Sequence, residues 1–327
     1  MSARTTAVCR ICDSPGRHNV FVVREMMLGT RDPFEYFECR DCGCLQIVSV
    51  PDDLARYYPP TYYSLSSDSP GARRGRIAHF LRGRRNRAAV LGGRGLGRLL
   101  ARFFPEPVLE SLALVPLTFD SAILDVGCGT GVHLRALQQI GFTNLLGVDP
   151  NIQSDLDHPP RVVVKKAQVH DVSPRSAWDL VTFHHSFEHV LDPIDQLRCV
   201  RDLLKPNGVC LIRIPVMKSE AWERYGVDWV QLDAPRHLFL HTIRSMEVVA
   251  AKAGLRVDRV VYDSTAFQFW GSEQYRMDVP LHADSDVGAW TRRTFSRRQM
   301  RAFEREAALL NRLGRGDQAA FILRRVP

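Results

Sequence analysis

The stretch from residue 122 to 149, AILDVGCGTGVHLRALQQIGFTNLLGVD, constrains the fold of this chain more than any other. Its apolar start predicts a buried parallel strand at 123–126, and apolar residues after position 132 recur at helical spacing. Between them, Gly127, Gly129 and Gly131 lack Cβ atoms, so the turn can press against a ligand beside the unpaired N–H groups of the helix. A second strand at 145–148 ends in Asp149, where an acidic side chain can bind the hydroxyls of a ribose. The stretch therefore predicts an α/β unit that binds a nucleotide-like ligand.

Strands and helices continue to alternate after this unit. Strands are predicted at 161–166, 179–184, 208–215, 256–263 and 321–326, and helices at 194–204 and 243–253. Such alternation implies a mostly parallel sheet with helices on both faces and with ligands at the carboxyl ends of the strands. Two segments, 216–241 and 265–320, interrupt the pattern, and we expect them to form lids over the substrate.

The glycine pattern distinguishes between two kinds of nucleotide site. A nicotinamide-binding turn reads G-x-G-x-x-G, whereas this chain reads G-x-G-x-G and places Asp125 in the strand before it. An acidic residue there suits a ligand with an ammonium group and repels a pyrophosphate. Together with Asp149, WDLVTF and LKPNG, the DVGCGTG motif resembles the class I S-adenosylmethionine-dependent methyltransferases over residues 122–327. The resemblance implies a Rossmann-like, seven-stranded, mostly parallel sheet whose seventh strand is antiparallel and lies between the fifth and sixth.

The same resemblance implies a set of cofactor-binding residues. Asp125 is expected to meet the ammonium group, Asp149 the ribose, and the residues after the third strand the adenine. A tyrosine, Tyr63 or Tyr58, is expected to close over the methionine end, although the tyrosines of this segment would equally cover the junction between two domains. The expected cofactor residues are Asp125, Gly127, Cys128, Gly129, Gly131, His133, Asp149, Gln168, Val169, His184 and Tyr63.

Two clusters are candidates for the chemistry of methyl transfer. His189, in the HHSFEHVLDP segment after the fourth strand, is the expected general base, because a neutral imidazole accepts a proton near pH 7, and Glu188 is expected to orient it. The alternative is that His189 only caps or packs the next helix. His237, within PRHL, is a second candidate base. Residues around it are expected to bind the substrate, namely Trp222, Trp229, Arg236 and His241.

The N-terminal segment carries a metal-binding pattern. Cys9-x2-Cys12 and Cys39-x2-Cys42 form two pairs that can bind one tetrahedral zinc ion, and Cys44 is a less suitable substitute for Cys42. Because four thiolates leave no open position, the zinc is expected to be structural. The sequence thus predicts a zinc-ribbon-like module at 1–68, a basic helical linker at 69–121 and the catalytic domain at 122–327.

The net charge of +8 is concentrated in two segments. Residues 69–105 hold ten arginines and no acidic residue, and residues 292–325 hold ten arginines against three acidic residues. In the first segment, Leu96, Leu99, Leu100 and Phe103 recur at helical spacing, and we expect this apolar face to pack on the domain. The alternative is contact with an anionic membrane or a phosphorylated substrate.

No apolar run is long enough to span a membrane and no signal sequence is visible, so a cytoplasmic enzyme is expected.

These features favour a small-molecule methyltransferase, and two alternatives remain. The expected acceptor is a sugar, cell-surface or secondary-metabolite precursor that is methylated on oxygen, and the layout also resembles bacterial sugar C-methyltransferases. The first alternative is an RNA methyltransferase that uses the zinc module and the arginines, but HHSF stands where an N-P-P-[YF] motif would be expected. The second is a cofactor-binding interaction protein without catalysis, which the EH and PRH clusters disfavour.

Overall fold

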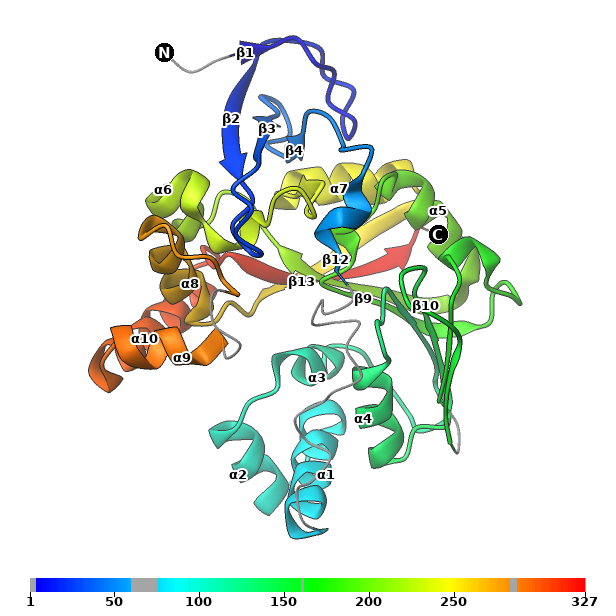
Figure 1. Ribbon diagram of the computed structural model, residues 1–327. Helices are drawn as coiled ribbons and strands as arrows, with labels where there is room; N and C mark the ends of the chain where they lie inside the picture. Colours follow the sequence, from blue (N-terminus) through cyan, green and yellow to red (C-terminus); the bar gives the residue numbers. More distant parts are fainter. Residues whose placement is uncertain (1–3, 60–75, 94, 160–161, 283–286, 327) are drawn as a thin grey trace.

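The protein consists of a large mixed sheet with helices on both faces and a small antiparallel sheet near the N-terminus (Figure 1). The computed structural model describes residues 4–59, 76–93, 95–159, 162–282 and 287–326. The large sheet has the spatial order β12-β13-β10-β9-β5-β6-β8-β7. Its strands are β5 (Ala122–Val126), β6 (Asn144–Val148), β7 (Leu156–His158), β8 (Val162–Lys165), β9 (Trp178–His184), β10 (Leu204–Pro215), β12 (Leu255–Tyr262) and β13 (Gln318–Arg325).

This sheet confirms the fold predicted from the sequence. Each of the seven predicted strands is present with ends that shift by a few residues, and β13 lies antiparallel between β10 and β12. Strands β8, β6, β5, β9 and β10 are parallel to one another. The sequence did not predict β7, an edge strand of three residues that pairs antiparallel with β8. A strand this short has too few residues to show an alternating pattern.

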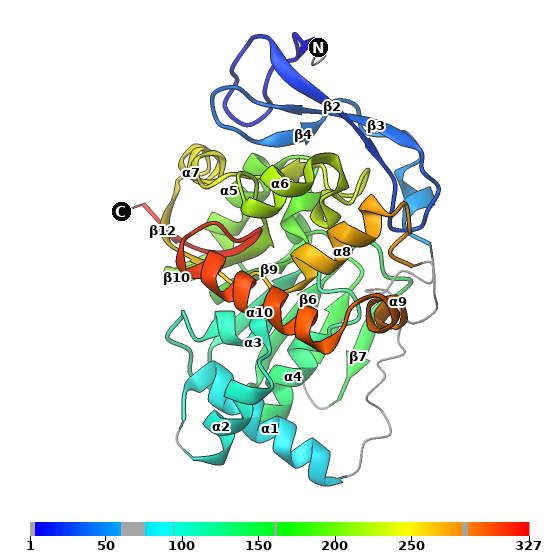
Figure 2. The same ribbon diagram turned by 90° about the vertical axis from the view of Figure 1, so that its left-hand side faces the viewer.

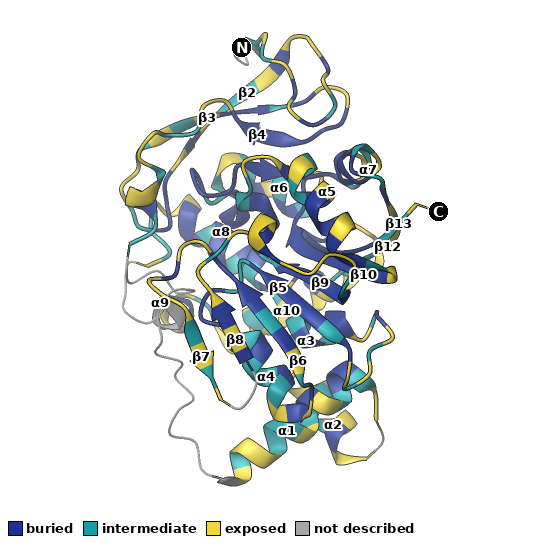
Figure 3. Ribbon diagram, turned by 90° about the vertical axis from the view of Figure 1, so that its right-hand side faces the viewer, coloured by how far each residue is buried: buried dark blue, intermediate teal, exposed yellow. Residues whose placement is uncertain are grey.

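Helices cover the large sheet on both sides, so its central strands β5, β9 and β10 are mostly buried, whereas the edge strands β7 and β12 are more exposed (Figure 3). Apolar residues of α1, α3 and α4 pack on one face, and those of α5 and α7 pack on the other. The segment 265–320 supplies α8, α9 and α10, and α8 and α10 contact each other. The helices are α1 (Arg76–Leu91), α2 (Leu96–Phe103), α3 (Pro107–Leu112), α4 (Val132–Ile140), α5 (Pro193–Leu203), α6 (Glu220–Tyr225), α7 (Ile243–Lys252), α8 (Phe267–Arg276), α9 (Val287–Thr294) and α10 (Arg297–Arg312).

Short 3-10 helices occur where the chain turns between these elements. They are η1 (Leu54–Tyr57), η2 (Val169–Asp171), η3 (Phe187–His189), η4 (Gly226–Asp228) and η5 (Val230–Leu232). Within the described part of the chain, no helix has the length and apolar character needed to cross a membrane.

The small sheet is completed by a strand from the segment 216–241. Its order is β1-β2-β3-β4-β11, and all neighbouring strands are antiparallel. Four of the strands come from the N-terminal segment, whereas β11 pairs with β4 from a position about two hundred residues later in the chain. The two parts of the protein therefore share a sheet (Figure 2), and the expected lid at 216–241 also binds the N-terminal segment. The strands are β1 (Arg4–Thr5), β2 (His18–Arg24), β3 (Pro33–Glu38), β4 (Leu45–Ile47) and β11 (Phe239–Leu240).

A buried ion pair joins the same two parts of the protein. The guanidinium of Arg236 lies 2.7 Å from a carboxylate oxygen of Glu25 and 2.6 Å from one of Asp233. Arg236 and Glu25 have no exposed side-chain surface. The Glu25 carboxylate also accepts hydrogen bonds from the backbone N–H groups of Leu28, Gly29 and Thr30, so it fixes the turn after β2. Arg236 therefore connects the turn after β2 to the segment that leads into β11.

Replacement of Arg236 is expected to destabilise the protein strongly. In Arg236→Met, the carboxylates of Glu25 and Asp233 lose a buried cation, and breaking such a pair costs about 3–5 kcal/mol. Arg24→Met is the matched control, because the Arg24–Asp278 pair is exposed and such pairs contribute about 0–1 kcal/mol. Urea denaturation of both variants measures the two losses of unfolding free energy. Equal losses would show that the buried pair does not hold the two parts together.

Candidate active site

A cavity of about 970 Å³ opens at the carboxyl ends of β5, β6 and β9. This is the edge at which ligands bind in open α/β sheets. Three groups of residues line the cavity: the glycine turn after β5, the segment after β8, and the tip of β9 with η3. The N-terminal segment contributes Leu54, Ala55 and Tyr58 to its wall, and α3 contributes Val108. The cavity is therefore built by the large sheet and covered in part by η1.

The glycine turn after β5 has a backbone that other residues rarely adopt. Gly127, Gly129 and Gly131 have φ angles of 71°, 53° and 75°, in the left-handed region. A Cβ atom on Gly127 would collide with the side chain of Ser186, and one on Gly131 would lie 2.7 Å from Cγ2 of Val164. The absence of side chains at these two glycines thus lets the turn pack closely against β8 and the tip of β9.

Two buried carboxylates lie below this turn. Asp149 accepts hydrogen bonds of 2.8 Å from the backbone N–H groups of Gly129 and Asn151, one on each oxygen. Asp125 accepts a hydrogen bond of 2.7 Å from Oγ1 of Thr182, its neighbour in the parallel register of β5 and β9. Burial raises the pKa of Asp125 to about 7, although the Thr182 hydrogen bond lowers it and the charge of Asp149 raises it further. A cationic group bound beside Asp125 would restore its ionised form.

Most of the predicted cofactor residues converge on this cavity. Gly129 and Gly131 belong to the turn without appearing in the cavity lining, and Tyr63 lies outside the described residues. The predicted residues that line the cavity are Asp125, Gly127, Cys128, His133, Asp149, Gln168, Val169 and His184.

His133 and His184 form an uncharged part of the cavity wall. Their rings lie 5.6 Å apart between centroids. Burial lowers the pKa of His133 to about 4 and also lowers the pKa of His184 well below its ordinary value. Both imidazoles are therefore neutral at pH 7, and neither repels a cation in the cavity.

His189 lies in the cavity wall with its tautomer fixed by the backbone. Its Nδ1 atom is 2.8 Å from the carbonyl oxygen of Arg236, which can only accept a hydrogen bond, so Nδ1 carries the proton. The hydroxyl of Tyr58 lies 3.0 Å from the same nitrogen. This arrangement leaves the lone pair on Nε2 of His189. Burial, together with the nearby His237, lowers the pKa of His189, which keeps the imidazole neutral and able to accept a proton.

Glu188 is a fully buried carboxylate, and its neighbours include the imidazoles of three histidines. Its Oε1 atom is 3.4 Å from Nδ1 of His185 and 3.8 Å from Nε2 of His237. Burial opposes its charge, but the three surrounding histidines outweigh this effect and lower the pKa of Glu188 to about 2. The carboxylate is therefore ionised. His237 donates from Nδ1 to the carbonyl of Gln231 at 2.7 Å, so its Nε2 is directed toward Glu188.

The structure also reveals site residues that the sequence analysis missed. His185 lines the cavity with a φ of 52°, which is rare outside glycine, and its Nε2 accepts a hydrogen bond of 2.8 Å from Arg213. Ser186 donates a hydrogen bond of 2.6 Å to the carbonyl of Val126 and so holds the tip of β9 against the glycine turn. The parallel register of β5 and β9 places Thr182 beside Asp125, so aligning the two predicted strands could have found Thr182. No sequence signal indicates the backbone conformation of His185.

The four predicted substrate residues lie elsewhere. None of Trp222, Trp229, Arg236 and His241 is among the described residues that line the cavity. Trp229 is buried and donates a hydrogen bond of 3.0 Å to Asp317, and Trp222 packs edge-on against Phe21 of β2. His241 is fully buried, 4.0 Å from the sulfur of Cys44. Together with Arg236, Trp222 and His241 contact the N-terminal segment.

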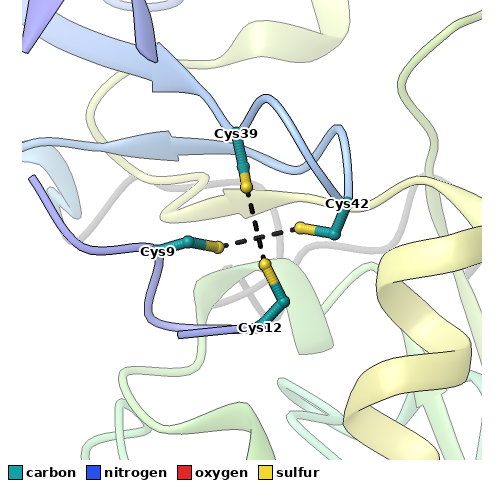
Figure 4. A group of neighbouring side chains, drawn as sticks. All are labelled: Cys9, Cys12, Cys39 and Cys42. Atoms are coloured by element: carbon teal, nitrogen blue, oxygen red, sulfur yellow. Dashed lines mark hydrogen bonds between the residues drawn. The ribbon is translucent and has the colours of Figure 1, made fainter. Parts of the chain in front are cut away.

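The four cysteines predicted to bind metal lie together at one end of the small sheet (Figure 4). Their sulfur atoms all lie within 4.8 Å of one another, with 3.7 Å between Cys9 and Cys42 and 3.6 Å between Cys12 and Cys39. Zinc–sulfur bonds of about 2.3 Å in a tetrahedron require sulfur separations of about 3.8 Å, so the cluster fits a zinc ion. Cys44 is not part of the cluster.

Comparisons with known proteins agree with the geometry of the cavity. The sequence profile described as "Methyltransferase domain" matches residues 82–260. The ubiquinone biosynthesis O-methyltransferase of Bordetella avium is 31% identical over 150 residues, which cover 41% of this chain and 61% of that protein. The tRNA U34 carboxymethyltransferase of Shewanella amazonensis is 28% identical over 128 residues, which cover 35% of this chain and 38% of that protein. The chain thus spans about half the length of such relatives.

One solved structure aligns with about two thirds of this chain at low sequence identity. The S-adenosylmethionine dependent methyltransferase from Mesorhizobium loti aligns with 68% of this chain and 99% of its own, at 16% sequence identity and a TM-score of 0.45. The matched sequence profile covers more than half of the 327 residues and includes the glycine turn, Asp149 and the Glu188-His189 pair. The chain therefore belongs to the methyltransferase domain family, and its sheet is the Rossmann-like sheet expected of class I S-adenosylmethionine-dependent methyltransferases.

Proposed function

We propose that the enzyme methylates a hydroxyl group of a small molecule, with His189 as the general base. The observation that carries this proposal is the fixed tautomer of His189, whose Nδ1 proton is held by the Arg236 carbonyl while the side chain lines the cavity. The acceptor belongs to the sugar, cell-surface or secondary-metabolite precursors. A hydroxyl is a poor nucleophile at neutral pH, so a positioned base is needed.

The glycine turn and its two carboxylates would hold S-adenosylmethionine. Asp149 offers oxygen atoms to the ribose hydroxyls and Asp125 lies where the ammonium group would neutralise its charge, while Gln168 and Val169 lie near the expected adenine. Gly127 itself lines the cavity, so a ligand bound there would lie against the backbone of the turn. The bound cofactor supplies an electrophilic methyl group on a sulfonium ion.

His189 and Glu188 would then handle the proton of the acceptor. Nε2 of His189 would accept the proton that the acceptor hydroxyl gives up when its oxygen is methylated. The resulting imidazolium lies beside the ionised carboxylate of Glu188, which stabilises it. His237 is the second candidate base, because its Nε2 carries a lone pair and its ring centroid lies 4.8 Å from that of His189, but it is not among the described residues that line the cavity.

The lining of the cavity favours a small acceptor over RNA. The described residues that line it include no lysine or arginine. They do include four aspartates, namely Asp125, Asp149, Asp192 and Asp195. An RNA strand would bring phosphates close to these carboxylates without a cation nearby. A volume of about 970 Å³ also lies within the range of small-molecule sites. The relative from Bordetella avium is named for O-methylation, and the relative named for tRNA makes RNA the second candidate.

Transfer of a labelled methyl group tests the class of acceptor. We expect the enzyme, incubated with methyl-labelled S-adenosylmethionine, to label a small-metabolite extract and not total RNA of the source organism. The variant Gly127→Val, in which the new side chain collides with Ser186, serves as the control that cannot bind the cofactor. Label in RNA would overturn the small-molecule proposal. Cofactor binding without transfer to either fraction would favour a non-catalytic interaction protein.

Replacement of His189 tests its assignment as the base. We expect His189→Ala to lower kcat by about 10²–10⁴-fold while the Kd for S-adenosylmethionine stays unchanged, because the residue acts on the acceptor. His79→Ala, on the exposed surface of α1, should leave kcat unchanged. Since the pKa of His189 is lowered from 6.5, the base is already neutral above pH 6.5, and the acid limb of kcat/KM in the native enzyme should lie below that pH. An unchanged kcat in His189→Ala would transfer the role to His237.

We also propose that the four cysteines bind a structural zinc ion. Four sulfur ligands would leave no open position for a substrate, and the cluster lies in the small sheet, outside the cavity lining. The ion would hold the loop after β1 to the turn after β3, in a module with few core residues of its own.

Loss of one cysteine ligand should remove the metal and loosen the small sheet. We expect Cys39→Ser to lower the zinc content, measured by plasma mass spectrometry, from about one equivalent per chain to near zero, and to lower the thermal midpoint. Cys199→Ser, in α5 and far from the cluster, is the control that should keep its zinc. Retention of zinc by Cys39→Ser would contradict the assignment.

A further inference from the structure

Helix α2 packs on α1 through its smallest residue. The two helices form a pair at the end of the molecule opposite the small sheet (Figures 1 and 2). Gly97 of α2 is buried in this contact, and a Cβ atom there would lie 2.7 Å from the carbonyl oxygen of Arg84 and 3.2 Å from Cβ of Ala88. The face of α2 that carries Gly97 is therefore the face against the protein.

This packing turns the apolar face of α2 outward. Leu99 is 53% exposed and Phe103 is 68% exposed, and Leu96 and Phe104 are exposed as well. The sequence analysis expected this face to pack on the domain, and that expectation is wrong, because the close approach at Gly97 orients the helix the other way. We call the exposed residues Leu96, Arg98, Leu99, Arg102, Phe103 and Phe104 the α2 surface.

The α2 surface combines apolar side chains with positive charge. Arg98 and Arg102 are exposed beside the leucine and phenylalanine side chains. The surrounding segment 69–105 holds ten arginines and no acidic residue, so its charge is uniformly positive. Helix α1 adds exposed Arg84 and Arg87, and its first turns expose Phe80. An apolar stripe with adjacent cations is the pattern of a helix that lies in the interface of a bilayer.

We propose that the α2 surface binds an anionic lipid bilayer. The arginines match the negative headgroups, and the leucine and phenylalanine side chains gain by entering the boundary with the acyl chains. RNA would satisfy the arginines and could stack on the two phenylalanines, but it would leave Leu96 and Leu99 without an apolar partner. Exposed apolar side chains of this size in a cluster also mark an interaction surface rather than ordinary solvent-facing residues.

The α2 surface lies close in sequence to the wall of the active site. After Phe104, the chain turns into α3, whose Val108 lines the cavity. Binding at the α2 surface would therefore hold the cavity near the membrane. The proposal does not depend on the proposed acceptor, because membrane binding is measured without turnover.

Co-sedimentation with vesicles tests the α2 surface. We expect the full-length protein to bind vesicles of phosphatidylglycerol and phosphatidylcholine, to bind phosphatidylcholine vesicles much more weakly, and to lose affinity as salt is raised. Arg98→Glu with Arg102→Glu should weaken binding by about 30-fold or more. Leu99→Ser with Phe103→Ser should weaken it by about tenfold or more.

Exposed leucines on another basic helix provide the matched control. Leu309→Ser with Leu313→Ser changes two exposed leucines at the end of α10, which also carries several arginines, and should leave vesicle binding unchanged. All three double variants alter exposed side chains, and thermal denaturation verifies that each one folds. Equal loss of binding in the α10 control, or no loss in Leu99→Ser with Phe103→Ser, would overturn the proposal. Binding to RNA without binding to anionic vesicles would also overturn it.

Discussion

The buried contact of Arg236 is the interaction on which both parts of the protein depend. Its guanidinium binds Glu25 at the turn after β2, and its backbone carbonyl accepts the Nδ1 proton of His189. One residue thus anchors the small sheet and sets the tautomer of the candidate base. Replacing such a pair with apolar residues often costs little stability, so the value of an ion pair here lies in fixing one arrangement of the two parts.

The N-terminal part of the protein therefore contacts the residues that position His189, and none of its own residues is proposed as a base or nucleophile. The four-cysteine cluster lies where the loop after β1 meets the turn after β3, and farther along the chain η1 leads to Tyr58, whose hydroxyl lies 3.0 Å from Nδ1 of His189. A change at the cysteines would reach the cavity by this route. The cavity wall and the metal-binding pattern are thus close in sequence as well, because Leu54 of the wall follows soon after Cys42.

The fold could be predicted from the sequence because its signals are local. The strand, glycine turn and helix at 122–149 occupy consecutive residues, and the collision that a Cβ atom on Gly127 would cause explains why glycine is needed there. The same signals placed Asp125, Asp149 and His189 at the cavity. Their catalytic and binding roles rest on the proposed chemistry, since position alone does not establish them.

Substrate binding was predicted for several residues of the segment 216–241, but their positions are decided by long-range contacts that no local sequence pattern reveals. Trp222, Arg236 and His241 have the residue types of a substrate site, but β11 pairs with β4, and this long-range pairing turns the side chains toward the N-terminal segment. Helix α2 shows the same limit, because its apolar spacing predicted burial while the contact at Gly97 decided its orientation. In both places, tertiary contacts outweighed the sequence pattern.

The pairing of β11 with β4 also has a consequence for the order of synthesis. On the ribosome, β1 to β4 emerge first, yet the open edge of β4 finds its partner only after residue 240 has been made. Until then, this edge presents unpaired backbone groups that can associate with other chains. During that interval the pairing of β1 to β4 with one another, and a metal ion if the four cysteines bind one, would be what holds the nascent strands together.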